Sequence, residues 1–257
     1  MNLQLENKYF ITCGASSGFG KAIARSLLQE GARVLAIARN QDQLSNFSTE
    51  FPGQVDILAG DLTKSETLQD IVRKVADKKV DGMLVNSGGP PVKTIKETTM
   101  QDWDDAYHSI LRWKVELIKM ILPYFEEQAY GRILVIESSS VKQPIENLVL
   151  STSLRLAIVG FVKTLVQENN FPGITMNIIA PGSHDTPAIA RIIEDLSKKQ
   201  DISFDEAKKA LENKIPARKL GNPTDFASLA TWLLSPLSNF VTGQTISVDG
   251  GIIKATI

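Results

Sequence analysis

Residues 11–20 read Ile-Thr-Cys-Gly-Ala-Ser-Ser-Gly-Phe-Gly, and this stretch decides the fold of the chain. The apolar residues that precede it predict a strand, and apolar residues at helical spacing follow it until Gly31. Glycines let the backbone approach a ligand closely, and the N-terminus of a helix favours a phosphate. Strand, glycine-rich turn and helix in this order predict a dinucleotide-binding turn. The alternative is a glycine-rich connection that binds nothing.

The spacing of the turn is Thr12-x-Gly14-x-x-x-Gly18-x-Gly20. This spacing resembles the TGxxxGxG motif of the short-chain dehydrogenase/reductase family, and the resemblance runs nearly from end to end of the chain. It implies an NAD(P)(H)-dependent oxidoreductase of the 3-oxoacyl-carrier-protein reductase type. The cofactor-binding residues that it implies in the turn are Gly14, Ser16, Ser17, Gly18, Phe19 and Gly20.

The alternation of apolar strand patterns with helical patterns predicts an α/β fold. We expect a doubly wound, Rossmann-type parallel sheet of about seven strands with helices on both faces, as one domain over residues 1–257. Long apolar helices are expected over 102–128 and 148–169. Residues 187–214 contain two amphipathic helical patterns and no strand pattern. An insertion at the carboxyl edge of a sheet predicts a substrate lid.

Composition narrows the classes of function. The net charge is −1, with acidic and basic residues interspersed, so no nucleic-acid surface is indicated. We expect no membrane span, no secretory segment and no metal site, since two histidines and one cysteine form no ligand cluster. The lone Cys13 excludes an internal disulfide, and a cytoplasmic protein is expected. Two long apolar helices predict a homodimer or homotetramer, the latter being the form that we favour.

The end of the second predicted strand, Ala38-Arg39, bears on the choice of cofactor. An acidic residue there binds the ribose 2′-hydroxyl of NAD, whereas an arginine accommodates the 2′-phosphate of NADP. We therefore expect NADP(H) to be preferred over NAD(H), the alternative being that Arg39 is an ordinary surface arginine. The family resemblance places Asp61 and Leu62 at the adenine. Asp61 could instead cap the helix that begins near residue 64.

Two further stretches resemble cofactor-binding segments of the family. Asn86-Ser-Gly-Gly89 resembles its Asn-Asn-Ala-Gly segment, which implies a role for Asn86 and Gly88 in the cofactor pocket. Pro181-Gly-Ser-His-Asp-Thr186 resembles its PGxxxT segment, which implies that Pro181, Gly182 and Thr186 hold the nicotinamide carboxamide.

The catalytic positions depart from the family. Classical members use Ser, Tyr-x-x-x-Lys and Asn. Ser138 matches the serine, but Ser151 and Arg155 stand where the tyrosine and lysine belong, and Ile110 stands in place of the asparagine. We assign Ser138, Ser151 and Arg155 as the catalytic set, with Arg155 also holding the cofactor. The proton donor is therefore noncanonical, and Lys142 and His184 are further candidates for it.

Three functions remain open at this stage. The first is an NADP(H)-dependent reductase of a small carbonyl substrate, such as a 3-oxoacyl compound. The second is a dinucleotide-binding protein without redox turnover, acting as a sensor or a subunit. The third is an enzyme that uses the pocket for chemistry other than carbonyl reduction.

Overall fold

A computed structural model describes residues 1–168 and 172–256 of the chain. Its sheet is parallel and has the strand order β3-β2-β1-β4-β5-β6-β7, which confirms the predicted doubly wound fold. The strands are β1 (Tyr9–Cys13), β2 (Arg33–Ala38), β3 (Val55–Ala59), β4 (Gly82–Val85), β5 (Gly131–Ile136), β6 (Ile174–Pro181) and β7 (Thr245–Val248).

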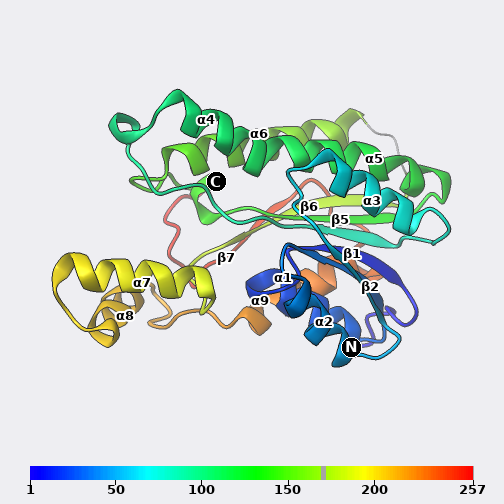
Figure 1. Cartoon of the computed structure of the whole chain (residues 1–257), viewed down its shortest axis with the longest axis horizontal. Coiled ribbons are helices and arrows are strands. Elements are labelled where there is room, and N and C mark those ends of the chain that lie inside the picture. Colours follow the sequence, from blue (N-terminus) through cyan, green and yellow to red (C-terminus); the bar gives the residue numbers. More distant parts are fainter. Residues whose placement is uncertain (169–171, 257) are drawn as a thin grey trace.

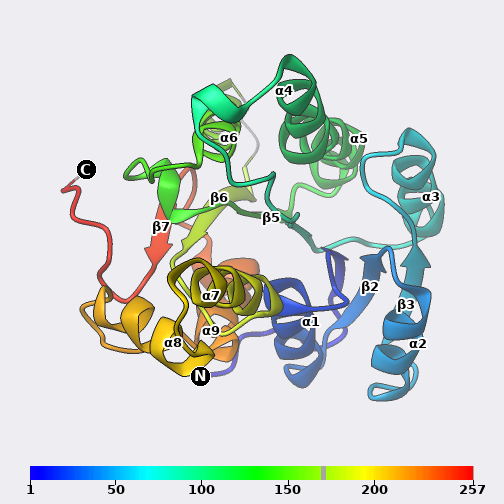
Figure 2. The ribbon, with the colours of Figure 1, turned by 60° about the vertical axis from the view of Figure 1, so that its left-hand side comes forward.

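Helices cover both faces of the sheet (Figure 1). One face carries α3 (Ser65–Val75), α4 (Met100–Ala106), α5 (Trp113–Glu127) and α6 (Val149–Glu168). Apolar side chains of α3, α5 and α6 form one core cluster with the sheet. The other face carries α1 (Gly18–Gln29), α2 (Gln41–Thr49) and α9 (Pro223–Leu234), which form the second cluster. Helices α7 (Pro187–Gln200) and α8 (Phe204–Asn213) pack on each other at one end of the sheet and share a small core of their own (Figures 1 and 2).

The long helix expected over 102–128 is not continuous. A π-helical segment, Tyr107–Arg112, separates α4 from α5. Within it the Ser109 carbonyl accepts a hydrogen bond from the Trp113 indole at 2.9 Å, a side-chain partner from outside the backbone ladder. Such segments occur frequently at functional sites. Ile110, in place of the family's asparagine, lies buried within this one.

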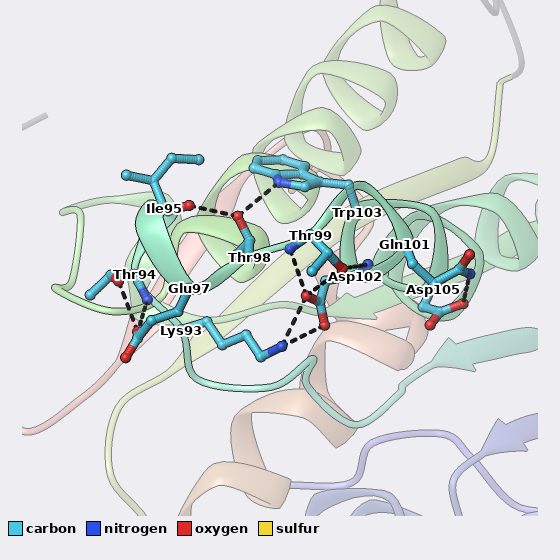
Figure 3. Close-up of polar contacts among 10 residues, drawn as sticks. All are labelled: Lys93, Thr94, Ile95, Glu97, Thr98, Thr99, Gln101, Asp102, Trp103 and Asp105. Atoms are coloured by element: carbon cyan, nitrogen blue, oxygen red, sulfur yellow. Dashed lines mark hydrogen bonds and ion pairs between the residues drawn. The ribbon is translucent and has the colours of Figure 1, made fainter.

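The connection from β4 to α4 is held by short-range polar contacts (Figure 3). Thr94 and Thr99 each begin a helix with a reciprocal capping box, their partners being Glu97 and Asp102. Lys93 Nζ also contacts Asp102 at 2.8 Å, and this contact, followed by the bonds from Thr99, lowers the pKa of that carboxyl to about 2. Lys93 also forms a bridge with Leu148, directly before α6. The connection therefore fixes the start of the helix that carries Ser151 and Arg155.

Among the described residues, α6 is long and apolar enough to cross a membrane, with a mean hydropathy of 1.6 and 28% of its apolar window buried. Length and composition alone do not make a helix a membrane span, so the expectation of no membrane span stays a prediction. The helix nevertheless packs on the sheet, and its buried side chains are Leu150, Ser151, Arg155, Ile158 and Val162. Its remaining apolar surface, including Leu156, faces away from the core.

Candidate active site

A cavity of about 430 Å³ lies at the carboxyl ends of β1, β2, β3 and β4. Of the residues predicted from the sequence, it is lined by Gly14, Ser16, Ser17, Gly18, Phe19, Arg39, Asp61, Leu62, Asn86, Gly88 and Thr186. The structure adds Ser109 and Trp113 on the π segment and α5, and Arg191 on α7. The residues named for a dinucleotide are thus brought together from segments far apart in the chain.

The glycine-rich turn has a geometry that suits a phosphate. Gly14 and Gly18 adopt φ values of +69° and +53°, which glycine tolerates best. A Cβ on Gly20 would lie 2.1 Å from the Gly14 carbonyl oxygen. Gly20 is thus required for packing within the turn, and it does not line the cavity among the described residues. The Ser17 side chain caps none of the first N–H groups of α1, which leaves them available to a ligand.

Arg39 and Asp61 lie at the far end of the cavity, after β2 and β3. Arg39 is exposed at the rim. Asp61 Oδ1 accepts hydrogen bonds of 2.9 Å from the backbone N–H and the hydroxyl of Thr63, and these bonds, more than the nearby Arg39, lower the pKa of the carboxyl. The N-cap of α3 is Lys64, so the alternative that Asp61 caps that helix is wrong.

Asn86 fixes the glycine-rich turn from the neighbouring strand. A Cβ on Gly14 would lie 2.7 Å from its side-chain nitrogen, so the amide packs directly against the turn backbone. Two residues later, the carbonyl of Gly88 accepts a hydrogen bond of 3.1 Å from Arg155 Nη2. The wall of the cavity at Gly88 is therefore tied to α6.

The Pro181–Thr186 segment contributes through Thr186, which lines the cavity and caps α7. Pro181 and Gly182 are not among the described lining residues. Gly182 packs against Asp249, whose Cα would lie 2.7 Å from an added Cβ. His184 is buried, lies edge-on to Phe19 and Phe226, and its Nδ1 contacts the Gly182 carbonyl at 3.1 Å. It therefore serves the packing of the loop, and burial lowers its pKa.

Ser138, Ser151 and Arg155 are not among the described lining residues of this cavity. Ser138 Oγ accepts a hydrogen bond from the Ser140 N–H at 3.2 Å, and Ser151 Oγ accepts one from Arg155 Nε at 3.1 Å. Within residues 1–168 and 172–256, neither hydroxyl donates to a protein acceptor. Each hydroxyl therefore has an O–H that is not used by a described protein acceptor.

Arg155 is also paired with a residue that sequence reasoning missed. Its Nη1 lies 2.7 Å from Glu137 Oε2, and the other carboxylate oxygen of Glu137 lies 2.6 Å from Lys114 Nζ. The signals in the sequence were a lysine within the apolar pattern of 102–128 and a glutamate that closes an apolar strand. The expected contact of Arg155 with the cofactor stays a prediction, because its described partners are Glu137, Ser151 and Gly88.

Lys142, the further candidate for a proton donor, caps the end of the short helix Ser139–Val141 and is half-buried. It is not among the described lining residues of the cavity. A separate groove lies on the π segment and α5, lined by Tyr107, which is 43% exposed, with Leu111, Val115 and Met120.

The comparisons with known proteins agree with this geometry. A family model of the short-chain dehydrogenase/reductase type, described as enoyl-(acyl carrier protein) reductase, matches residues 14–253. The chain belongs to the short-chain dehydrogenase/reductase family. The match spans the glycine-rich turn, the catalytic positions and the α7–α8 insertion, which makes the chain an NAD(P)-binding oxidoreductase that acts on a carbonyl or alcohol substrate.

Relatives within the family cover nearly the whole chain. The 3-oxoacyl-[acyl-carrier-protein] reductase of Thermotoga maritima is 28% identical over 98% of this chain and 100% of its own length. The NADPH-dependent reductase BacG of Bacillus subtilis is 26% identical over 94% of this chain and 96% of its own length. The L-sorbose reductase of Gluconobacter frateurii, solved with NADPH and L-sorbose, covers 99% of this chain and 100% of its own, with a TM-score of 0.93 and 25% identity.

Proposed function

We propose that the protein is an NADPH-dependent reductase of a small carbonyl compound, such as a 3-oxoacyl substrate, in which Ser138 and Ser151 replace the usual serine and tyrosine. The observation that carries this proposal is that the Ser138 and Ser151 hydroxyls each accept a hydrogen bond and, among the described residues, donate none to the protein. Relatives that are a 3-oxoacyl-[acyl-carrier-protein] reductase and an NADPH-dependent reductase support the substrate class and the cofactor.

The nucleotide, when bound, supplies the hydride that forms the new C–H bond at the carbonyl carbon. The protein has to hold the carbonyl oxygen and protonate it as the C=O electron pair moves onto that oxygen. Ser138 and Ser151 each offer an O–H for this purpose. Ser151 passes its proton to the substrate oxygen and recovers one from water. The charge-assisted hydrogen bond from Arg155 Nε stabilises the negative charge left on Ser151 Oγ during the transfer.

The two arginines at the cavity have separate roles in this proposal. Arg39, beside the neutral Ala38, binds the 2′-phosphate of NADPH through its planar fork. Arg191 lies on α7, beside Thr186, Pro187 and Ala188 in the lining of the cavity. We propose that α7 and α8 form the substrate lid, with Arg191 as the lid cation that lines the cavity.

The experiment measures NADPH and NADH binding by fluorescence and then NADPH oxidation with a panel of carbonyl substrates. Ser151→Ala should retain NADPH binding and lose about 10²-fold or more in kcat, the lower end of what general acid catalysis contributes. Thr152→Val is the matched control, because it removes a hydroxyl without a partner from the next residue of α6. Binding without oxidation of NADPH by any carbonyl would favour the second function, a dinucleotide-binding protein without turnover.

A further inference from the structure

Three charged side chains form a buried cluster behind the candidate site. Lys114 comes from α5, Glu137 follows β5 and Arg155 comes from α6. The Lys114 and Glu137 side chains are fully buried, and that of Arg155 is 6% exposed. One carboxylate is thus shared between two cations, at distances of 2.6 and 2.7 Å.

A buried charge cluster of this kind is a poor way to stabilise a fold. Removing charges from water is expensive, and apolar residues of similar volume often serve a protein core better. Its net charge is +1 when all three groups are ionised. The other titratable group that faces Lys114 is Cys13 on β1, whose pKa burial raises to about 12, so this thiol stays neutral and cannot balance the charge.

Arg155 is the member of the positively charged cluster that contacts the candidate site. Its guanidinium contacts Glu137 with Nη1, Ser151 Oγ with Nε and the Gly88 carbonyl with Nη2. These three contacts fix the plane of the guanidinium. The cluster thereby touches both the proposed proton donor and the wall of the cofactor cavity.

We infer that Lys114 and Glu137 are positioning residues of the reaction: Glu137 orients Arg155 toward Ser151, and Lys114 keeps the cluster at a net positive charge that stabilises the substrate oxygen as it becomes anionic. This inference rests on the proposed function. It explains why a lysine is buried next to a pair, Glu137 and Arg155, that would be neutral without it.

The proposed role of Lys114 makes the rate of the reaction depend on pH. Burial, aided by repulsion from Arg155 and opposed by Glu137, lowers the pKa of Lys114 to about 8. Below that pH the cluster carries +1, and above it the cluster is neutral. The rate of the chemical step should therefore fall as the pH rises through about 8, although neither serine hydroxyl titrates in this range.

The test compares native enzyme with two variants by single-turnover oxidation of NADPH between pH 6 and pH 10. Lys114→Met has a neutral cluster and should lose about 10-fold in rate below pH 8, the effect of one charge at several ångströms in a protein interior, with no further decline at higher pH. In the double variant Lys114→Met/Glu137→Gln, the cluster again has a net charge of +1, which Arg155 carries. The glutamine carbonyl oxygen can still accept a hydrogen bond from Arg155. This double variant should be faster than Lys114→Met and insensitive to pH near 8.

Lys74→Met on the exposed face of α3 is the control for loss of a lysine charge, and its profile should match the native one. A second readout is independent of turnover: the 13Cε resonance of Lys114 in the protein without nucleotide should titrate near pH 8, and in Glu137→Gln at a lower pH. A Lys114→Met enzyme with the native rate and profile would overturn the inference, as would a Lys114 resonance that titrates above pH 10. Failure of the native enzyme to oxidise NADPH with any carbonyl would contradict the proposed function instead.

Discussion

Lys114→Met should make the protein more stable at neutral pH while making it a poorer enzyme. Among the physical causes that lower the pKa of Lys114, loss of hydration is the largest and exceeds the attraction of Glu137. The charged ammonium of Lys114 therefore has a higher free energy in the native fold than in the unfolded chain. Methionine has a similar length and no charge, and Glu137 keeps Arg155 as its partner at 2.7 Å.

The size of the effect follows from proton linkage. The pKa of Lys114 falls from 10.5 in the unfolded chain to about 8 in the fold, and each unit corresponds to about 1.4 kcal/mol. Ionised Lys114 thus costs the fold about 3 kcal/mol below pH 8. The unfolded chain binds more protons between pH 8 and 10.5, so native stability contributed by this group rises with pH in that window. We expect Lys114→Met to gain about 1–3 kcal/mol at pH 7, since the lysine's hydrogen bond is lost as well.

The assay is reversible urea unfolding of native protein, Lys114→Met and Lys74→Met at pH 7 and pH 9.5. The advantage of Lys114→Met should shrink by about 2 kcal/mol between these two pH values, because native Lys114 loses its proton there. Lys74 is exposed on α3, so its variant should follow the native curve at both. A Lys114→Met protein that is less stable than native at pH 7, or a difference that does not change with pH, would refute the reasoning.

Three further predictions concern the cofactor turn, the nucleotide preference and assembly. Arg39→Ala should weaken NADPH binding by about 10-fold or more and NADH binding hardly at all, measured by fluorescence titration; equal losses would contradict the role of Arg39 in binding the 2′-phosphate. Gly20→Ala should abolish binding of both nucleotides and lower the melting temperature, because its Cβ would lie 2.1 Å from the Gly14 oxygen. Gly53→Ala is the control: nothing lies within 4 Å of the added Cβ, so this variant should be destabilised only by the strain of its positive φ. The native chain should sediment as a dimer or tetramer at micromolar concentration, and Leu111→Glu, in the open groove with Tyr107, Val115 and Met120, should shift it toward monomer; a native monomer would count against assembly through this face.

Much of the fold could be predicted from the sequence because its elements carry local signals. The glycine-rich turn, the apolar strands and the two helices of 187–214 are each specified by residues close together in the chain. The π segment escaped prediction, because its apolar residues keep near-helical spacing while the backbone shifts by one residue. A side-chain bond to the freed carbonyl, from Trp113 to Ser109, is visible only in three dimensions.

The cofactor cavity was largely predictable for the same reason, since its residues follow strand ends in the order of the chain. The charge cluster was not. Lys114, Glu137 and Arg155 lie on three elements, and each alone reads as an isolated charge in an apolar pattern. Only the folded chain, in which α5 and α6 pack on the same face of the sheet, brings one carboxylate between two cations.

This arrangement changes the meaning of the missing Tyr-x-x-x-Lys motif. Two departures from the family, Ser151 and Arg155, form one connected set of contacts with Lys114 and Glu137 instead of scattered losses. A lysine at position 155 could not replace the arginine, because one ammonium point charge cannot reproduce three donors held in a plane toward Glu137, Ser151 and Gly88. A tyrosine at position 151 would need the space that the guanidinium occupies, because Ser151 is already buried against it. These contacts favour our proposal that the site is a reductase centre built around a buried arginine over the alternative of a classical centre that has decayed.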